Sequence, residues 1–161
     1  MDARDTQILS ILQRDARTSN AEIARELGMA PSGVLERLRK LERRGVVRGY
    51  TARIDPEAVG VGLLAYVFVQ ADDRAGEENS GAQLARLPEV QEVHHIAGED
   101  CYLVKVRCGS TAALGRLLQE KFGAIPTVRR TRTTIVLGTL KESWQLPLPE
   151  LDREVNHDGA A

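Results

Sequence analysis

The sequence has none of the features of a membrane or exported protein. No apolar run approaches the ~18 residues that a membrane span needs, and the first residues are polar and charged, unlike a signal peptide. A chain of 161 residues can hold one ordinary domain or two small ones. We therefore expect a cytoplasmic protein without a membrane partner.

Metal-binding and disulfide patterns are also absent. The only two cysteines, Cys101 and Cys108, are an odd number of residues apart, so on one strand they would point to opposite faces. His94 and His95 are adjacent, with the same consequence. No C-x-x-C or H-x-x-x-H spacing occurs. The sequence predicts no metal site and no cofactor.

Catalytic motifs are missing as well. An amino-acid-regulated enzyme subunit would need catalytic groups, but the chain has no Gly-rich phosphate loop and no nucleophile motif. An RNA-recognition domain would stack bases on aromatic residues of its central strands. The stretch CYLVKVRC at 101–108 lacks the Gly-aromatic-Gly/Ala-Phe core of that motif. We expect a protein that is not an enzyme.

The net charge of −1 hides an asymmetry along the chain. Residues 1–53 contain 11 Lys or Arg against 7 Asp or Glu, a net of +4. Residues 54–161 contain 11 against 16, a net of −5. A basic part joined to an acidic remainder suggests that only the first part contacts the phosphates of a nucleic acid.

The segment Ala30–Gly45 (APSGVLERLRKLERRG) is a predicted amphipathic helix. Pro31 suits its first turn and Gly45 its end. Helical spacing gives it one apolar stripe, formed by Val34, Leu35, Leu38 and Leu41. Its other faces are polar and mainly basic, with Ser32, Gly33, Glu36, Arg37, Arg39, Lys40, Arg43 and Arg44. Taken alone, this pattern also fits a solvated surface helix.

The preceding residues favour a helix-turn-helix. Ser19 and Glu22 have the spacing of a capping box at a helix start, and Gly28 can take the left-handed conformation at that helix's end. A three-residue turn then leads into the basic helix, which is the layout that places a second helix in the major groove. An earlier helix capped by Asp2 would close a three-helix core, with an apolar side formed by Ile8, Leu9 and Leu12.

The remainder predicts a ferredoxin-like domain. An extended strand at 46–54 and a linker at 55–62, with Asp55-Pro56, Gly60 and Gly62, would precede it, and a tail would follow from 143 to 161. Strands are expected at 63–71, 90–97, 101–108 and 128–140. Helices are expected within 72–87, with Leu84 and Leu87 inward, and after a Ser110 cap, with Leu114, Leu117, Leu118 and Phe122 inward.

This order, β-α-β-β-α-β, defines an α+β chain: an N-terminal three-helix helix-turn-helix domain joined to a C-terminal ferredoxin-like domain over 63–142. The helices of such a domain cover one face of an antiparallel sheet. We expect the same sheet of a second subunit to cover the other face.

Four stretches of the chain together match one known pattern. They are Asp2-x-x-Asp5-x-x-Ile8-Leu9, then SNAEIARELGMAPSGVLERLRKLERRGVVRGYTA, then Gly98 before a strand, and TRTTIVLGTLKES. Over about residues 2–143 the chain resembles the Lrp/AsnC family of bacterial and archaeal feast/famine transcription regulators. The resemblance implies a helix-turn-helix joined to a regulatory domain, often called the RAM domain, which forms dimers and octamers and commonly binds an amino acid.

Two positions depart from the family's pattern. Ala30 stands where the family usually has Ser, and a lost cap costs about 1 kcal/mol unless Ser32 or the turn compensates. The family's effector loop reads Gly-Asp-aromatic-Asp before an aromatic or aliphatic residue, whereas this chain reads Gly98-Glu99-Asp100-Cys101-Tyr102. Asp100 would have to hold an amino acid's ammonium group from a shifted place.

An amino-acid pocket needs an anion, carboxylate-binding donors and apolar walls. Gly98 lets the backbone approach a ligand, which leaves amides for a carboxylate. Val136 could add an apolar wall. The predicted effector residues are Ile96, Gly98, Glu99, Asp100, Cys101, Tyr102, Thr133 and Thr134. An ordinary, solvated acidic turn without a ligand is the alternative.

The expected function is sequence-specific binding of double-stranded DNA to regulate transcription. Base edges would be approached by Ser32, Gly33, Glu36 and Arg37, and phosphates by Arg and Lys near the helix ends. The predicted DNA-binding residues are Ser19, Asn20, Ser32, Gly33, Glu36, Arg37, Lys40, Arg43 and Arg44. Two subunits in successive major grooves predict a pseudo-palindromic site.

A small effector, expected to be an amino acid bound between regulatory domains, would alter the assembly of the homodimer or octamer, or its DNA affinity, by changing the spacing of the recognition helices. The alternative is a nucleoid-type protein that organises DNA without a ligand. This alternative remains because a regulator and a DNA-organising protein would share both domains.

Overall fold

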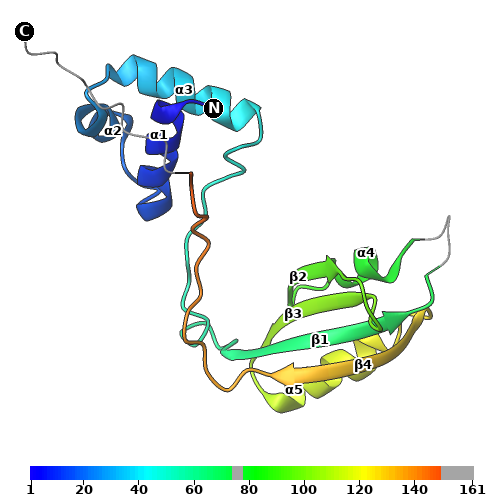
Figure 1. Cartoon of the computed structure of the whole chain (residues 1–161). Helices are drawn as coiled ribbons and strands as arrows, with labels where there is room; N and C mark the ends of the chain where they lie inside the picture. Colours follow the sequence, from blue (N-terminus) through cyan, green and yellow to red (C-terminus); the bar gives the residue numbers. More distant parts are fainter. Residues whose placement is uncertain (74–77, 150–161) are drawn as a thin grey trace, which may run out of the picture. The chain divides into compact units, whose positions relative to one another are not determined.

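The computed structural model describes residues 1–73 and 78–149, in two compact units (Figure 1). One unit comprises Met1–Ala52 together with the chain that follows Leu140, and the other comprises Arg53–Leu140. The sequence analysis predicts a boundary between 54 and 63 and a separate tail from 143. The described part of that tail instead joins the helical unit.

Hydrogen bonds from Gln13 account for this difference. Its Nε2 donates to the carbonyl of Leu146 at 3.2 Å, and its Oε1 accepts from the Leu146 N–H at 2.6 Å. The side chain of Gln145 donates to the backbone carbonyl of Gln13 at 3.0 Å. The tail is thus hydrogen-bonded to the first helix, a partner that no local sequence pattern reveals.

The helical unit has the three predicted helices: α1 (Ala3–Arg14), α2 (Asn20–Leu27) and α3 (Pro31–Arg43). Their shared core consists of Ile8, Ile11, Ile23, Ala24, Val34 and Leu38. Leu12 packs against this core, and Leu41 is also buried. Leu35 was expected in the apolar stripe but is 36% exposed, because the stripe that meets the neighbouring helices is narrower than the sequence suggests.

The predicted caps of this unit are confirmed. Asp2 and Asp5 form a capping box at the start of α1, and Ser19 and Glu22 form one at the start of α2. Gly28 ends α2 with φ 63°, the left-handed conformation that favours glycine. Two caps and a glycine therefore fix the helix-turn-helix locally.

The strand predicted at 46–54 does not form. These residues have bent or irregular backbone, and no strand includes them. A strand needs a neighbouring strand to satisfy its backbone groups, and in the described part of the chain the sheet consists of β1 to β4, none of which pairs with these residues. The extended pattern was read correctly as non-helical but wrongly as a strand.

The second unit has an antiparallel sheet in the order β2-β3-β1-β4. Its strands are β1 (Leu63–Ala71), β2 (Val90–His95), β3 (Tyr102–Cys108) and β4 (Val128–Ile135). Its helices are α4 (Ser80–Leu84) and α5 (Thr111–Arg116), and α5 continues into a π-helical turn, η1 (Leu117–Phe122). The predicted Ser110 cap is present, since its side chain accepts from the Ala113 N–H. The βαββαβ prediction is confirmed.

One face of the sheet carries the core. Alternate residues of β1, from Ala65 to Ala71, pack with those of β3 and with helix residues that include Leu84 and Phe122. The register places Tyr66 opposite Lys105 and Phe68 opposite Leu103, on the other face. Tyr66, Phe68 and Leu103 are only partly buried there.

Three strand ends were predicted too long. β4 stops at Ile135, which pairs with Ala65 near the start of β1, so only Val136, whose N–H donates to the carbonyl of Leu64, can extend the pairing by one more hydrogen bond. Leu137 and Leu140 are accordingly almost fully exposed. The hairpin between β2 and β3 is closed by the Ile96 N–H, which donates to the Cys101 carbonyl. Residues 96–101 therefore form the turn and belong to neither strand.

Candidate DNA interface and effector loop

Helix α3 presents a polar surface with few internal partners. Pro31 occupies its first turn, and Ala30 precedes it without a side-chain cap, as predicted. Ser32 and Glu36 are exposed, and Gly33 is half-buried. These positions lie on the first turns of the helix, which are the turns that approach base edges when a recognition helix enters the major groove.

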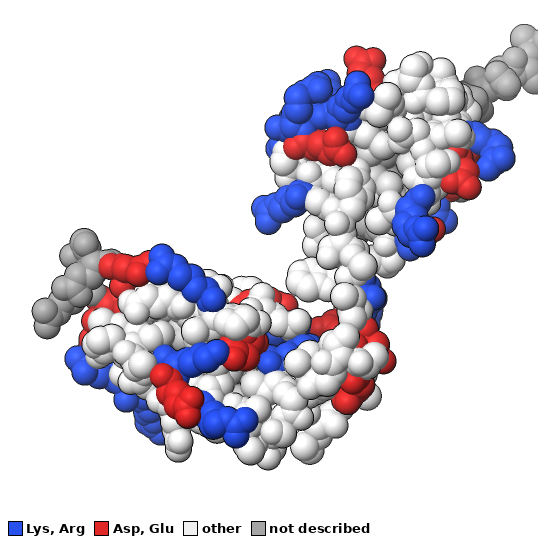
Figure 2. Space-filling view, turned by 180° about the vertical axis from the view of Figure 1, so that it is seen from behind, with Lys and Arg blue, Asp and Glu red and all other residues white. Residues whose placement is uncertain are grey.

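Four basic side chains continue this surface: Arg39, Lys40, Arg43 and Arg44. All are exposed, and within the described ranges none has a side-chain hydrogen bond or an ion pair. In Figure 2 the basic side chains of the helical unit stand at the surface, with acidic ones between them. Cations without protein partners can bind phosphates without first breaking an ion pair.

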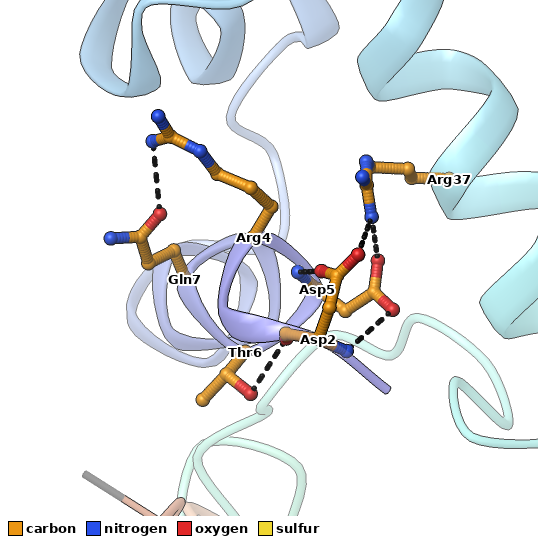
Figure 3. Close-up of polar contacts among 6 residues, drawn as sticks. All are labelled: Asp2, Arg4, Asp5, Thr6, Gln7 and Arg37. Atoms are coloured by element: carbon orange, nitrogen blue, oxygen red, sulfur yellow. Dashed lines mark hydrogen bonds and ion pairs between the residues drawn. The ribbon is translucent and has the colours of Figure 1, made fainter. Parts of the chain in front are cut away.

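Arg37, predicted to contact DNA, differs from these four side chains because it has partners within the protein. Its Nη1 donates to Asp2 Oδ2 at 2.6 Å and to Asp5 Oδ1 at 2.7 Å (Figure 3). Both carboxylates raise the pKa of Arg37 through these hydrogen bonds. The helical spacing placed Arg37 beside the polar face, but it could not show that the first turn of α1 already binds this side chain.

The two predicted DNA contacts on α2 are placed by its cap. Ser19 is the N-cap residue, and its hydroxyl donates to Glu22 Oε2 at 2.7 Å. The hydroxyl and backbone hydrogen bonds from Ser19 lower the pKa of Glu22. Asn20 is the first helical residue and is half-buried. Ser19 therefore has a structural role independent of DNA.

The effector loop joins β2 to β3, and its acid is already paired. Gly98 has φ 141°, a conformation that favours glycine. Asp100 Oδ2 accepts from Arg132 of β4 at 3.0 Å. The guanidinium of Arg132 lies 4.0 Å from the centre of the Phe68 ring. Glu99, by contrast, is exposed and in the described chain has no ion-pair partner.

Cys101 and Tyr102 are bound into the fold. The Cys101 thiol donates to the carbonyl of Ala71, and its N–H donates to the carbonyl of Val69. The Tyr102 hydroxyl donates to Asp73, at the end of β1. These contacts tie the start of β3 to the end of β1, so neither residue is held open for a ligand.

Sequence reasoning missed the polar cluster around Tyr102, which we call the Asp73 network: Asp73, Ser80, Tyr102 and Thr127. Ser80 is fully buried, and its hydroxyl lies 2.6 Å from both Asp73 Oδ1 and Thr127 Oγ1. Burial acts to raise the pKa of Asp73, but hydrogen bonds from Ser80 and Tyr102 lower it overall. Burial, together with Asp73, raises the pKa of Tyr102 to about 12. The pair Asp72-Asp73 immediately after the apolar strand was the available signal.

The two threonines of β4 that were predicted as effector residues, Thr133 and Thr134, lie away from the hairpin. Thr133 pairs with Val67 and Thr134 with Tyr66, so these two residues occupy opposite faces of the sheet. Arg132, which the sequence analysis did not select, is the β4 residue that reaches the loop. Ile96 is half-buried at the base of the hairpin.

The histidines and cysteines do not gather into a cluster. His94 contacts Glu92 at 3.1 Å, whereas the ring of His95 lies 5.4 Å from that of Tyr102. Both cysteines are free thiols. Across the residues with assigned structure, no group of three His, Cys, Asp or Glu could hold a metal ion. No helix in 1–73 or 78–149 is long and apolar enough to cross a membrane.

The fold and the exposed helix α3 define a helix-turn-helix protein with a separate ferredoxin-like domain. Two family models match it: residues 1–48 fit a winged helix-turn-helix DNA-binding domain, and residues 64–146 fit the Lrp/AsnC ligand binding domain. The chain belongs to the Lrp/AsnC family, and it is a DNA-binding transcriptional regulator with a ligand-binding domain.

Known relatives agree over nearly the whole length. The leucine-responsive regulatory protein of Salmonella typhimurium is 37% identical, covering 91% of this chain and 90% of its own. A feast or famine regulatory protein from M. tuberculosis, complexed with L-methionine, has a TM-score of 0.84 and 39% identity, over 92% of this chain and 99% of its own. A transcriptional regulator from Neisseria meningitidis in complex with L-Met has a TM-score of 0.84 and 30% identity, over 91% and 96%.

Proposed function

We propose that the protein regulates transcription as a homodimer, or an octamer built from dimers, bound to a pseudo-palindromic site in double-stranded DNA. The unpaired basic side chains of α3 carry this proposal, since they can bind phosphates while Ser32, Gly33 and Glu36 approach base edges. Lys40, Arg43 and Arg44 take the phosphate role. The protein would act in the cytoplasm, at the nucleoid.

The second face of the sheet supports the proposed dimer. Tyr66, Phe68 and Leu103 form an apolar strip that stays partly exposed in one chain. Burying such a strip against the same strip of a second copy gives the two-fold symmetry that paired recognition helices need. Sedimentation of the full chain without DNA should therefore show a dimer or octamer at micromolar concentration. A monomer would contradict the proposed assembly.

The effector is proposed to be an amino acid bound beside the hairpin. Two relatives of known structure contain methionine, and the Asp100–Arg132 pair has both charges that a free amino acid requires. Asp100 would take the ammonium group and Arg132 the carboxylate, which replaces one ion pair by two charge-assisted contacts. Thr133 and Thr134 remain candidate hydroxyls further along β4.

Calorimetric titration with L-methionine and the other amino acids tests this site. Asp100→Asn should weaken binding by ~10- to 150-fold, the effect of losing a charge-assisted contact worth ~1.5–3 kcal/mol. Glu99→Gln is the matched control and should leave affinity unchanged. If Glu99→Gln weakens binding and Asp100→Asn does not, the ammonium group binds Glu99. If neither variant changes the affinity for the ligand, the pocket lies elsewhere.

A ligand-independent DNA organiser is the second candidate, because the acid, thiol and phenol of the loop are all engaged within the chain. Filter binding with specific and random duplexes, with and without amino acids, separates the two. A regulator should prefer one duplex and respond to a ligand. An organiser should bind both duplexes alike and ignore amino acids at millimolar concentration.

A further inference from the structure

One arginine of the recognition helix is bound by the first turn of another helix. Arg37 of α3 reaches both Asp2 and Asp5 of α1 with a single guanidinium nitrogen (Figure 3). Asp5 has only 11% of its side chain exposed and Arg37 has 33%, so this ion pair is partly shielded from solvent. Arg37 contrasts with the four exposed basic residues that follow it on α3.

The capping box of α1 holds both carboxylates in place. Asp2 Oδ1 accepts from the Asp5 N–H at 2.9 Å, and Asp5 Oδ2 accepts from the Asp2 N–H at 3.2 Å. Each carboxylate thus uses one oxygen for the cap and the other for Arg37. The hydrogen bonds from the Asp5 backbone and from Arg37 lower the pKa of Asp2. The acceptor pair is therefore preorganised before Arg37 binds.

Helix α1 also holds α2. Arg4 donates to the carbonyl of Leu27 at 3.0 Å, at the C-terminal end of α2, and Arg14 pairs with Glu26 at 2.8 Å. The start of α3 has no side-chain cap. Polar contacts with α1 therefore orient both helices of the helix-turn-helix, and Arg37 is the residue that makes this contact from α3.

We propose that Arg37 is a positioning residue: it holds α3 in its DNA-binding orientation through Asp2 and Asp5, and it does not read a base. Sequence discrimination then depends on two acidic residues whose oxygens are fully used within the protein. The pairing also neutralises negative charge close to a helix that must approach phosphates.

The double variant Asp2→Asn/Asp5→Asn tests this role in the full chain. Asn is as good an N-cap as Asp and keeps an oxygen for the capping box, so the main loss is the charge that holds Arg37. Simple electrostatics predicts tighter DNA binding after two negative charges are removed. The positioning role predicts the opposite for a specific duplex: affinity roughly tenfold weaker, the scale of one lost base contact. Binding to random DNA should stay equal or tighten.

A mutant cycle with Arg37→Gln sharpens the test. If Arg37 acts only through the two acids, the losses of specific affinity in the two variants should not add. The double-Asn variant should keep the wild-type salt slope, because no phosphate contact is removed. Lys40→Gln is the matched control: it also removes one positive charge from α3, but it should weaken specific and random DNA alike.

Two results would overturn the proposal and return Arg37 to base reading. One is that the losses of specific DNA affinity add, and the other is that the double-Asn variant keeps its preference for the specific duplex. Circular dichroism checks that each variant is folded at the temperature of the binding assay. If the double variant unfolds, Asp2→Asn alone gives a comparison of the same sign and smaller size, since Asp5 still binds Arg37, the Asp2 side chain is 54% exposed and Asn preserves the cap. A purely structural role for Arg37 would lower thermal stability without changing the ratio of specific to random affinity, and would also refute the proposal.

Discussion

Helix α3 and the β2–β3 hairpin are the two candidate binding regions, and they differ in how far their polar groups are already used. Among the described residues, Arg39, Lys40, Arg43 and Arg44 have no partner within the protein. In the hairpin region the acid, the thiol and the phenol each have a partner within the protein. Asp100 pairs with Arg132, Cys101 with a carbonyl, and Tyr102 with Asp73.

The two regions differ in which interactions must be broken before a partner binds. A phosphate that approaches the basic side chains of α3 displaces only water. A ligand at the hairpin must replace an existing ion pair, so only a ligand that carries both charges avoids leaving one of them unpaired. DNA binding at α3 should therefore require no ion pair to break and should depend strongly on salt. Ligand binding at the hairpin should be selective for zwitterions.

The largest expected effect comes from removing the four unpaired cations of α3. Replacing Arg39, Lys40, Arg43 and Arg44 by Gln should reduce the salt slope by up to about four and weaken DNA binding by roughly 10³-fold at 0.1 M salt. Thermal stability should stay almost unchanged, because these side chains have no partners to lose. A large drop in melting temperature would instead assign them to the fold. The measurement is DNA affinity against salt concentration, alongside thermal unfolding.

A smaller effect, confined to stability, is expected at the Asp73 network. A Cβ added at Gly81 would lie 2.6 Å from Cε1 of the buried Tyr102 ring, so Gly81→Ala should destabilise the sheet unit by ~1–3 kcal/mol. Gly115→Ala in α5 is the matched control: its Cβ would meet nothing within 4 Å, and it should stabilise by ~0.5–1 kcal/mol. DNA affinity should not change in either variant. Denaturant unfolding that showed no difference between them would contradict the close packing at Gly81.

The smallest effect is a pH dependence of the same network. The folded protein holds the pKa of Tyr102 at about 12, above the ordinary value of 10, because burial and Asp73 oppose the phenolate. The protonated Tyr102 side chain therefore makes its full contribution to the free energy of unfolding below pH 10, and this contribution is lost as the pH rises toward about 12. Absorbance at 295 nm should show Tyr102 ionising only as the pH approaches about 12. Ionisation of Tyr102 near the ordinary pH of 10 in a chain that remains folded would argue against the hydrogen bond to Asp73.

Local features were predictable because their causes lie within a few residues. The capping boxes of α1 and α2 and the turn at Gly28 depend on spacings of three or four positions, and the structure has all of them. The apolar strand expected at 63–71 also forms over those same residues. The missing cap at Ala30 was also visible, since only a side-chain oxygen can supply it.

Features that depend on distant partners were not predictable. Arg37 binds acids 32 and 35 residues away, and Asp100 binds an arginine 32 residues away. Helical spacing assigns a residue to a face, but it does not say what that face meets. The predicted strand at 46–54 failed for the same reason, because an extended pattern does not supply a neighbouring strand.

The hydrogen bonds between Gln13 and the tail make the helical unit a discontinuous domain, which affects the order of folding. The partners Gln13 and Leu146 lie 133 residues apart, so this contact can form only after nearly all of the chain has left the ribosome. The folded sheet shortens the effective loop, because the hydrogen bond from the Val136 N–H to the carbonyl of Leu64 joins two points within the intervening segment. Each halving of the effective loop lowers the entropic cost of closure by about 0.6 kcal/mol. The sheet unit therefore assists the last step in folding its neighbour, and a fragment cut after the helices would lack that step.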